Sequence, residues 1–562
     1  MRRHTWNIKA VNPDAERLSR QYRISATLAH ILLSRGISET DFHSFLFHDL
    51  AALHPPQLLP DMEKAVQRIQ AAAKTKENIF IIGDYDVDGI TSLAIFHEYI
   101  KQFPGIFSFY IPHRVKEGYG VSIEAIRQAK EKNATLIVAF DCGTNAYEEI
   151  SFARAQGIDM IIVDHHHPKE TSPAPSCAQG AFAFINPKRK DSQYPFRDLS
   201  SAALSYKLLE ALQGKSCYDA LDLVALSLVC DVVPLKGENR ILLKEGLKRL
   251  RTSERPAIKA LCEISKIKQQ QLDTFHLGYI LGPRLNASGR VASAQESLEL
   301  FLSDDNDRIV PIVKKLQEYN QLRRDIEAQI LKEAQAQVEM NSGDDYAIVV
   351  AGEGWHSGVL GIVASRLTDK YYRPSFVISF DEQRGRGSGR SIHSVHLMEV
   401  LEKCSDSLCT YGGHKKAAGI EIFKEGLEEF RERINTYIKN NTKPSDLIPV
   451  LEIDMQIGFS HITMDLIDEI ERLEPLGEEN PKALFVTTGV AKKSAPKRIN
   501  NTYSLWLSEG ALTFEGMISD KDMMEFAVYA DRFDIVYSLE KNTYHQSPRL
   551  IIRDLRLAGS EN

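Results

Sequence analysis

The chain has 562 residues, enough for several domains of ordinary size, and its 69 lysines and arginines against 76 aspartates and glutamates give a formal net charge of −7. This balance excludes a globally basic nucleic-acid-binding protein, so contacts with phosphate groups have to come from local basic clusters. Seven cysteines without a CxxC pair predict a reduced, cytoplasmic protein, and no apolar run reaches the roughly 18 residues of a membrane span.

The first part of the chain is predicted to be helical. Residues 14–75 are rich in Ala, Leu, Arg and Gln with short breaks, so we assign 1–75 to an N-terminal helical segment. From residue 78, short apolar runs such as NIFIIG, TLIVAF and DMIIVD alternate with amphipathic stretches. This alternation is typical of βαβ units that build a parallel sheet. Helical patterns dominate from about residue 200 to 300, and we assign 76–305 to one α/β domain.

A long helix and two further domains are expected next. In residues 309–340, apolar side chains recur every three or four positions, and the one proline, Pro311, falls in the first turn, where proline is tolerated. We predict a connecting helix over 306–342, roughly 45 Å long over its periodic part. A second α/β domain is expected over 343–440. Residues 441–562 alternate β-rich runs with polar turns and predict a small β-barrel or sandwich.

Three aspartates follow the first predicted strand of the α/β domain. The stretch GDYDVDG places Asp84, Asp86 and Asp88 directly after an apolar, β-branched run. An EF-hand loop would need a glutamate at its twelfth position, which here is Ile95, and it would follow a helix rather than a strand. A simple Asp–Gly turn is the other interpretation, but three carboxylates so close together repel one another. We therefore expect cations among them.

Acidic residues and histidines also follow later strands of this domain. Asp141 follows TLIVAF, Asp164 follows DMIIV, and the three histidines 165–167 come immediately after Asp164. Because ligands of open α/β sheets bind at the carboxyl ends of the strands, we expect these groups to converge with the aspartates at 84–88. Carboxylate oxygens and imidazole nitrogens together suit Mn²⁺ or Mg²⁺, and Mn²⁺ matches imidazole better. For the histidines alone, a surface cluster is the favoured alternative.

A fourth element carries an isolated carboxylate. Asp231 lies in the nearly apolar run LDLVALSLVCDVVPL at 221–235. Burying a lone carboxylate is costly, so Asp231 needs a partner, which a metal ion can supply. A helix-terminal aspartate bonded to backbone amides is the alternative, and this element alone favours neither. The four elements together favour the metal site.

These segments resemble the motifs of a known superfamily. GDYDVDG, FDCGT, VDHHHP and LVCDVVPLKGENR resemble the four motifs of the DHH phosphoesterases. LGPRLNASGR, GEGWHSGVLGIVASRL, GSGRS, YGGHKKAAG and LEPLGEENPKALF are similar, in this order, to the bacterial RecJ exonuclease family within it. The resemblance runs from roughly residue 20 to the C-terminus. The chain departs from the family pattern in two places. FRDLSSAALSYKLL has serines where relatives tend to carry Cys-Gly, and His167 is an additional histidine to which we assign no role. Neither departure is expected to touch a predicted ligand.

The resemblance implies an architecture and a function. The architecture is α/β: a DHH catalytic domain (76–305) with a parallel sheet, the connecting helix, a DHHA1 domain (343–440) and a C-terminal oligonucleotide-binding (OB) fold (441–562). The implied function is a 5′→3′ exonuclease that hydrolyses single-stranded DNA with two Mn²⁺ or Mg²⁺ ions, releases 5′-mononucleotides and serves recombination and repair. Implied partners are a RecQ-type helicase and a single-stranded-DNA-binding protein. The alternatives are a phosphoesterase acting on oligoribonucleotides or small nucleotides and a non-catalytic replication scaffold.

Residue roles follow from the motifs and from metal chemistry. We expect Asp141 to bridge the two ions, and Asp84 to be a sixth ligand candidate beside the other five. Asp164 and His166 are expected to orient a ligand or to contact phosphate, and His166 is counted among the catalytic residues. The predicted metal ligands are Asp84, Asp86, Asp88, Asp141, His165 and Asp231.

A separate segment is expected to hold the 5′ end of the strand. The glycines of GRGSGRS would let backbone amides approach a terminal phosphate, and Ser388 and Arg390 would add hydroxyl and guanidinium donors. A flexible surface loop is the alternative on composition alone, and the resemblance favours the phosphate site. Arg114, Arg284 and His414 are further substrate-binding candidates by the same resemblance.

Overall fold

The computed structural model describes most of residues 4–560. The residues within this range that it does not describe are 48, 104–106, 114–116, 119, 170–179, 341–344 and 543–544. The chain forms two compact units: the larger contains Leu50–Pro234 and Glu238–Lys443, and the smaller contains Met1–Asp49, Leu235–Gly237 and Pro444–Asn562. No helix among the described residues is both long enough and apolar enough to cross a membrane.

The larger unit begins with a parallel sheet. Its order is β3 (Phe107–Tyr110), β2 (Asn78–Gly83), β4 (Ala134–Phe140), β5 (Asp159–Val163), β6 (Ala183–Ile185). All neighbouring strands run in parallel. The central strands are almost continuously apolar because helices cover both faces of the sheet.

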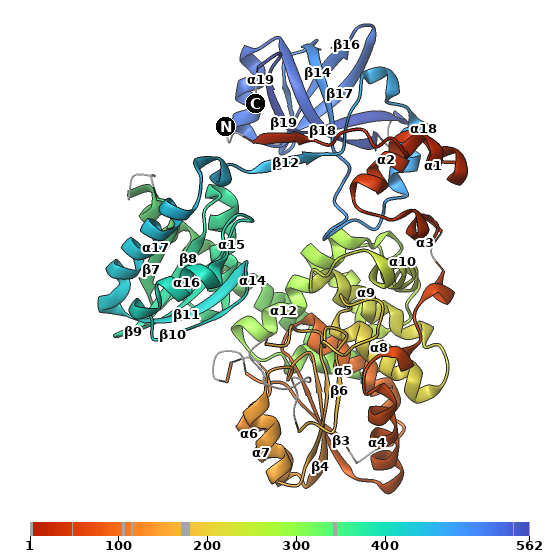
Figure 1. The fold of residues 1–562 in the computed structure, drawn as a ribbon, viewed down its shortest axis with the longest axis vertical. Helices are drawn as coiled ribbons and strands as arrows, with labels where there is room; N and C mark the ends of the chain where they lie inside the picture. Colours follow the sequence, from red (N-terminus) through yellow and green to blue (C-terminus); the bar gives the residue numbers. More distant parts are fainter. Residues whose placement is uncertain are drawn as a thin grey trace. The chain divides into compact units, whose positions relative to one another are not determined.

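Five helices cover this sheet, and Figure 1 shows α6 and α7 on one side and α4 on the other. Alternate side chains such as Phe80, Ile137 and Ile162 pack against α6 and α7 in one apolar core. The sheet is therefore sandwiched as the βαβ pattern predicts. The helices are α4 (Met62–Thr75), α5 (Val87–Ile100), α6 (Ile123–Glu131), α7 (Tyr147–Ala155) and α8 (Ser201–Gln213).

A helical region and one long helix continue the larger unit. A π-helical turn, His276–Leu281, leads directly into α12. Helix α14 (Asn306–Met340) is a single helix with Pro311 near its start, as predicted, and its 35 residues span about 52 Å. The shorter helices before it are α9 (Leu221–Cys230), α10 (Gly237–Arg251), α11 (Pro256–Ile264), α12 (Gly282–Val291) and α13 (Gln295–Leu302).

The second α/β domain has a mixed five-stranded sheet. Its order is β10 (Thr410–Gly413), β11 (Ala417–Phe423), β9 (Arg384–Arg390), β8 (Ser375–Asp381), β7 (Ile348–Glu353), and only β7 and β8 run in parallel. Helix α15 (Leu360–Tyr371) shares a core with β7 and with α14 residues such as Ile330. Helices α16 (Leu397–Lys403) and α17 (Leu427–Asn441) complete the domain, and Phe430 of α17 packs edge-on against Phe376 of β8.

The smaller unit contains a closed β-barrel. Strand β14 pairs with both β18 and β16, so the order β14-β18-β19-β17-β16 closes on itself, as in an OB fold. Strands β13 and β15 extend the sheet, and α18 (Met464–Glu471) and α19 (Lys521–Tyr529) accompany it. The strands are β13 (Met455–Gln456), β14 (Phe485–Lys492), β15 (Lys497–Ile499), β16 (Thr502–Glu509), β17 (Leu512–Ile518), β18 (Arg532–Asn542) and β19 (Ser547–Leu557). The structure therefore contains, in chain order, the predicted parallel-sheet domain, long helix, second α/β domain and β-barrel.

The N-terminal segment differs from the expectation of one helical piece over residues 1–75. Strand β1 (Thr5–Ile8) pairs in parallel with β12 (Val450–Ile453), and the buried Trp6 indole donates to Asp554 at 2.8 Å. Helices α1 (Ala15–Tyr22), α2 (Ala26–Ser34) and α3 (Phe42–Leu46) share the apolar core of the barrel, whereas α4 packs on the parallel sheet. Helical periodicity shows that a helix has an apolar face, but it does not show which sheet that face covers.

Candidate metal centre

The predicted ligands converge at one end of the parallel sheet. Asp84, Asp141 and Asp164 follow β2, β4 and β5, which are neighbours in the sheet. Asp231 reaches the same place from the C-terminus of α9. Three overlapping groups of ligand atoms lie within 4.8 Å of one another: Asp141, Asp164, His165 and His166; Asp88, His165 and Asp231; and Asp84, Asp86 and Asp141. Asp141 and His165 each belong to two groups.

His165 lies at the middle of this cluster. Its Nε2 atom is 3.3 Å from Asp141 Oδ1, 3.6 Å from Asp231 Oδ2 and 3.7 Å from Asp88 Oδ2. Both ring nitrogens are buried, and neither has a hydrogen-bond partner among the described residues. Burial, helped by the neighbouring His166, lowers the pKa of His165 to about 3, so the imidazole is neutral. A neutral, buried imidazole surrounded by carboxylate oxygens fits a metal ligand.

The carboxylates of the cluster repel one another. Burial and the nearby Asp88 raise the pKa of Asp141 and of Asp231 well above the ordinary value. Burial and Asp86 raise the pKa of Asp88 to about 6. Several carboxylates that cannot all ionise together are what a divalent cation stabilises. The donor set therefore fits the expected Mn²⁺ or Mg²⁺ ions.

The first turn of α5 fixes two of the aspartates. Asp86 is the N-cap, and its Oδ1 accepts from the backbone N–H of Asp88 at 2.9 Å and of Gly89 at 3.2 Å. A Cβ at Gly89 would lie 2.4 Å from the carbonyl oxygen of Asp84, so only glycine allows this approach. The glycine of the motif thus packs α5 against the end of β2.

Asp88 is held by neighbouring helices. Its carboxylate accepts from the backbone N–H groups of Ser201 and Ala202, both at 2.8 Å, and from Ser227 Oγ at 2.6 Å. The expectation that the serines of FRDLSS touch no predicted ligand is therefore wrong. Ser201 begins α8, and the backbone amides at a helix N-terminus suit a carboxylate regardless of side chain.

Asp141 and Asp164 are placed by two adjacent turns. Asp141 has φ of +60°, which is uncommon outside glycine, and its backbone N–H donates to Val163 at 3.0 Å. Asp164 Oδ2 accepts from the Thr144 N–H at 2.9 Å, and its Oδ1 lies 2.7 Å from His166 Nδ1. Burial disfavours the charged form of both groups. Their mutual attraction and hydrogen bond outweigh burial, so the pKa of Asp164 is lowered and the pKa of His166 is raised. The pair therefore favours an imidazolium at the edge of the cluster.

Two asparagines that we did not predict support the site. Asn286 of α12 accepts from the backbone N–H of Val87 at 3.0 Å. Asn186 donates to Thr144 Oγ1 at 3.0 Å and to the carbonyl oxygen of His166 at 2.9 Å. Asn286 lies in LGPRLNASGR, one of the segments that resemble the RecJ family, so this motif could have indicated it. Asn186 lies in an ordinary Asn-Pro turn and carries no sequence signal of its own.

The GRGSGRS segment does not form the expected backbone nest. It forms β9, which pairs with β8 on one side and β11 on the other, so its amides serve the sheet. A Cβ at Gly389 would lie 2.5 Å from the Phe376 ring, and the strand's other glycines are similarly crowded. The glycines therefore accommodate large apolar neighbours. Among the side chains of this strand, Arg390 donates to Ser388 Oγ at 3.2 Å and to the Gly389 carbonyl oxygen at 2.8 Å.

The other substrate-binding candidates are in different surroundings. Arg284 donates to Gln317 of α14 at 2.8 Å and to the Ile280 carbonyl oxygen at 2.6 Å, so its observed contacts are within the helical region. His414 lies in the turn between β10 and β11, where burial and then the charges of His166 and Lys188 lower its pKa. Arg114 lies outside the described residues.

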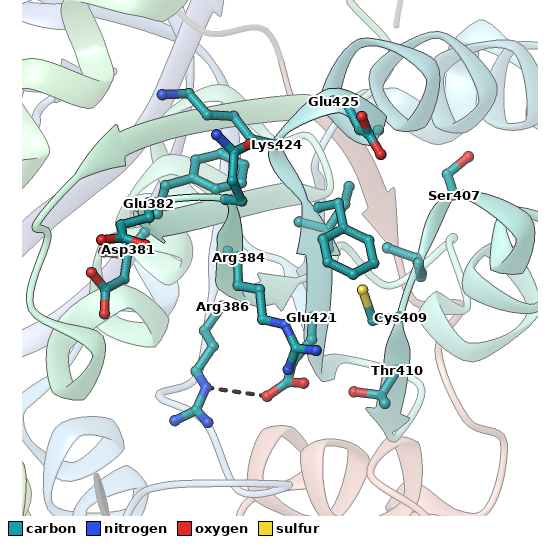
Figure 2. A pocket seen from close by; sticks show the side chains of 18 of the residues that line it. Asp381, Glu382, Arg384, Arg386, Ser407, Cys409, Thr410, Glu421, Lys424 and Glu425 are labelled. Atoms are coloured by element: carbon teal, nitrogen blue, oxygen red, sulfur yellow. Dashed lines mark hydrogen bonds and ion pairs between the residues drawn. The ribbon is translucent and has the colours of Figure 1, made fainter.

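A groove of about 1820 Å³ lies elsewhere, in the second α/β domain. Figure 2 shows Arg384 and Arg386 on β9 extending toward Glu421, with an ion pair of 3.1 Å between Arg386 and Glu421. Acidic side chains outnumber basic ones along its wall, and none of the predicted site residues lines it. The excess of acidic side chains disfavours DNA phosphates. None of the converging groups of ligand atoms found among the described residues lies in this groove.

Comparisons with known proteins cover nearly the whole chain. The DHH family N-terminal domain matches residues 78–228, the DHHA1 domain matches 343–440 and the RecJ OB domain matches 453–554. The single-stranded-DNA-specific exonuclease RecJ of Bacillus subtilis (strain 168) is 34% identical over 558 residues, which cover 98% of this chain and 70% of that protein.

Solved structures share this architecture. RecJ from Thermus thermophilus in complex with Mn²⁺ has a TM-score of 0.83 and 24% identity, covering 100% of this chain and 81% of that chain. An exonuclease RecJ bound to manganese is 29% identical with a TM-score of 0.60, covering 71% of this chain and 98% of that chain.

Proposed function

The chain belongs to the RecJ family of single-stranded-DNA-specific exonucleases, and on this premise we propose that it hydrolyses single-stranded DNA from the 5′ end and releases 5′-mononucleotides. The observation that carries the proposal is the complete donor set around His165, in which every predicted ligand is within reach of another. A scaffold without catalysis would have no need for this costly gathering of buried carboxylates. The proposed setting is DNA recombination and repair in the cytoplasm.

The residues that would hold Mn²⁺ or Mg²⁺ are Asp84, Asp86, Asp88, Asp141, His165 and Asp231. When bound, such ions supply Lewis-acid stabilisation of the phosphate and an acidified water for attack. Asp141 and His165 each belong to two of the three donor groups, and Asp141, whose carboxylate has two oxygens, would be the ligand shared by two ions.

The chain's own residues support the reaction in distinct ways. The backbone amides of Ser201 and Ala202 keep the Asp88 carboxylate oriented. Asp164 holds His166 by its Nδ1 atom and raises its pKa against the effect of burial, so a protonated His166 donates to a phosphate oxygen. No protein nucleophile is required in this scheme.

The second α/β domain is proposed to hold the 5′-terminal phosphate by side chains rather than by backbone amides. Arg390 and Ser388 share one face of β9 and are already hydrogen-bonded to each other at 3.2 Å. A guanidinium offers five N–H donors in a fixed plane, which matches the geometry of phosphate oxygens. Holding the terminal phosphate here sets the 5′→3′ direction.

The barrel is proposed to bind the strand beyond the scissile nucleotide. Trp506 on β16 is 48% exposed, and the neighbouring strand β15 carries the exposed Lys497 and Arg498. Aromatic faces stack on bases and basic residues neutralise phosphates, which favours long strands over small nucleotides as substrates. A RecQ-type helicase and a single-stranded-DNA-binding protein are the proposed partners, since they generate and coat such strands.

The test is hydrolysis of matched oligonucleotides with Mn²⁺ or with EDTA. We expect a single-stranded substrate carrying a 5′ label to release the labelled mononucleotide first, and only with the metal. A blunt duplex of the same sequence serves as the control and should resist. Release from the 3′ end, or hydrolysis that survives EDTA, would contradict the proposal.

A further inference from the structure

Two exposed aromatic side chains beside the metal centre have no role in the scheme above. Phe275 is the N-cap of the π-helical turn His276–Leu281 and is 58% exposed, and Tyr279 within that turn is 75% exposed. Their rings are stacked, with centroids 5.2 Å apart and an interplanar angle of 26°. Isolated exposed apolar residues are common, whereas this stacked pair forms one continuous aromatic surface. We refer to Phe275 and Tyr279 as the aromatic platform.

The backbone under the platform is unusual. π-Helical turns are rare and occur frequently at functional sites. This turn runs directly into α12, whose Asn286 accepts from the backbone N–H of Val87, between Asp86 and Asp88. The platform is therefore built on the same continuous helical segment as a residue that supports the predicted ligands.

The turn also packs against the end of α9, which carries Asp231. The Cys230 thiol donates to the carbonyl oxygen of Leu277 at 3.6 Å. A Cβ at Gly282, the first residue of α12, would lie 2.4 Å from Cys230 Sγ, so the two elements are in direct contact. A cavity of about 140 Å³ is lined by residues of both elements, among them Gly278 and Cys230. The turn that carries the platform thus touches the residue next to a predicted metal ligand.

The end of α9 exposes an apolar side chain as well. Val232 directly follows Asp231, is 61% exposed and has φ of +56°. A β-branched residue is strained in this left-handed region, and such strain is concentrated at functional sites. Two neighbouring elements at the metal centre therefore present apolar surface to solvent rather than burying it. A ligand of this surface combines charge for the metal ions with apolar faces for the platform.

We propose that the aromatic platform stacks against a base of the bound single strand and positions that strand at the metal centre. The inference rests on the proposed function and deepens it, because it assigns a contact to the bases, whereas the ligand cluster and Arg390 act on phosphates. A nucleobase suits the platform because every base has a flat π-face, and it is joined through its sugar to the phosphates of the strand. The bases of a duplex are already stacked and paired, so the platform favours an unpaired strand.

The first experiment compares Tyr279→Ala, Tyr279→Phe and Phe275→Ala with Tyr218→Ala, which removes an exposed aromatic residue that precedes the opposite end of α9. Initial rates are measured on a 5′-phosphorylated single strand with Mn²⁺, and Mn²⁺ binding is measured by calorimetry on each variant. We expect Tyr279→Ala to lower kcat/KM about 5- to 150-fold, the contribution of one stacked base, and Phe275→Ala to lower it as well. Tyr279→Phe keeps the ring and should remain close to the wild type, Tyr218→Ala should match the wild type, and all variants should bind Mn²⁺ alike.

The second experiment identifies the base. Each of the first nucleotides of the strand is replaced in turn by an abasic nucleotide, and the rate of the first cut is measured for the wild type and for Tyr279→Ala. At the stacked position the wild type should lose its advantage, because neither partner of the contact is then complete, and the two rates become equal. A deficit of Tyr279→Ala that is the same at every position would contradict stacking.

Four further results would overturn the inference. Alanine variants as active as an active wild type would refute it and leave the proposed function standing. A loss in Tyr279→Phe as large as that in Tyr279→Ala would assign the effect to the hydroxyl rather than to the ring. Weakened Mn²⁺ binding by Tyr279→Ala would show that the turn supports the metal site instead of the strand. A wild type without activity on single-stranded DNA would remove both proposals.

Discussion

The two α/β domains of the larger unit differ in whether their charged side chains are paired within the chain. The parallel sheet gathers carboxylates and an imidazole at its strand ends, where burial and mutual repulsion shift their pKa values. The mixed sheet pairs its charges internally: Arg386 with Glu421, and Lys424 with Glu353. Exposed pairs of this kind contribute about 0–1 kcal/mol, whereas unpaired buried charge is retained only where something else binds it. Unsatisfied charge therefore marks the chemical site, and a groove by itself does not.

The largest effect is expected from Asp141→Ala, which removes one of the buried carboxylates of the parallel-sheet domain. Removing a ligand shared by two donor groups should lower hydrolysis by about 1000-fold or more, since metal ions contribute several kcal/mol of transition-state stabilisation. The same change relieves repulsion among buried carboxylates but places alanine at a φ of +60°, so the melting temperature in metal-free buffer should change little. Rates on single strands and thermal melting of the same preparation are the two measurements. Near-wild-type activity would refute the shared-ligand assignment.

The pH dependence of stability should show the same repulsion in metal-free protein. Burial and Asp86 raise the pKa of Asp88 to about 6 from an ordinary value of 3.8. Between these values folded Asp88 binds more protons than unfolded Asp88, so its contribution to stability is highest below about 4 and is lost as pH rises through about 6. The raised pKa values of Asp141 and Asp231 extend this loss to higher pH. His165, with its pKa lowered from 6.5 to about 3, contributes in the opposite sense, and its contribution is complete above about 6.5.

Thermal melting across pH 4 to 8, with and without Mn²⁺, tests this dependence. Saturating Mn²⁺ should remove the loss near neutral pH, because the metal stabilises the ionised carboxylates and competes with protons. Above about pH 6.5 the His165 contribution is complete, so a metal-free protein whose stability still rises steadily from pH 6.5 to 8 would contradict the account.

Arg390→Ala tests the assignment of a binding role to the mixed sheet. We expect activity on 5′-phosphorylated strands to fall by about 1.5–3 kcal/mol in transition-state free energy, the range for a charged hydrogen bond. The preference for a 5′-phosphate over a 5′-hydroxyl should shrink with it. The matched control is Arg386→Ala, which removes an arginine from the same strand that is already paired with Glu421. Equal losses on both substrates would show that Arg390 does not bind the terminal phosphate.

The smallest expected effect is on the barrel. Trp506→Ala should weaken binding of long single strands by about 1–3 kcal/mol, the contribution of one stacked base, and leave very short oligonucleotides nearly unaffected. A point substitution is preferable to deleting the barrel, because α1 and α2 share its apolar core. Fluorescence anisotropy on strands of graded length measures the effect. Tyr529→Ala is the control, since this exposed aromatic residue ends α19 rather than lying on a strand.

The sequence predicted the convergence of the acidic residues and His165 better than it predicted the backbone of the glycine-rich segment. The aspartates at strand ends were identifiable because a parallel sheet sends all its carboxyl ends to one edge. Asp231 needed the other elements, since a lone aspartate in an apolar run has two equally good explanations. Neighbours distant in sequence, such as Asn186 and Ser201, contact the site through backbone and amide groups that leave no pattern.

The glycine-rich strand shows why composition misled the prediction. Glycines at 385, 387 and 389 suggest a loop or an anion nest, because glycine is common in both. In the structure they are alternate residues of an interior strand, facing Phe380, Ile378 and Phe376. The division of residues 1–75 between two units could not be predicted from the sequence either. A short strand such as Thr5–Ile8 forms by pairing with a strand more than 400 residues away, and the local sequence does not show that partner.

The most direct test of the central claim is the number of Mn²⁺ ions that the metal-free protein binds. Calorimetric titration at neutral pH should give two ions per chain for the wild type, and His165→Ala should lose at least one of them, because Nε2 lies within 3.7 Å of three carboxylates. Single-strand hydrolysis measured on the same samples should fall with the lost ion. A His165→Ala variant that still binds two ions with unchanged affinity and cleaves DNA normally would contradict the account.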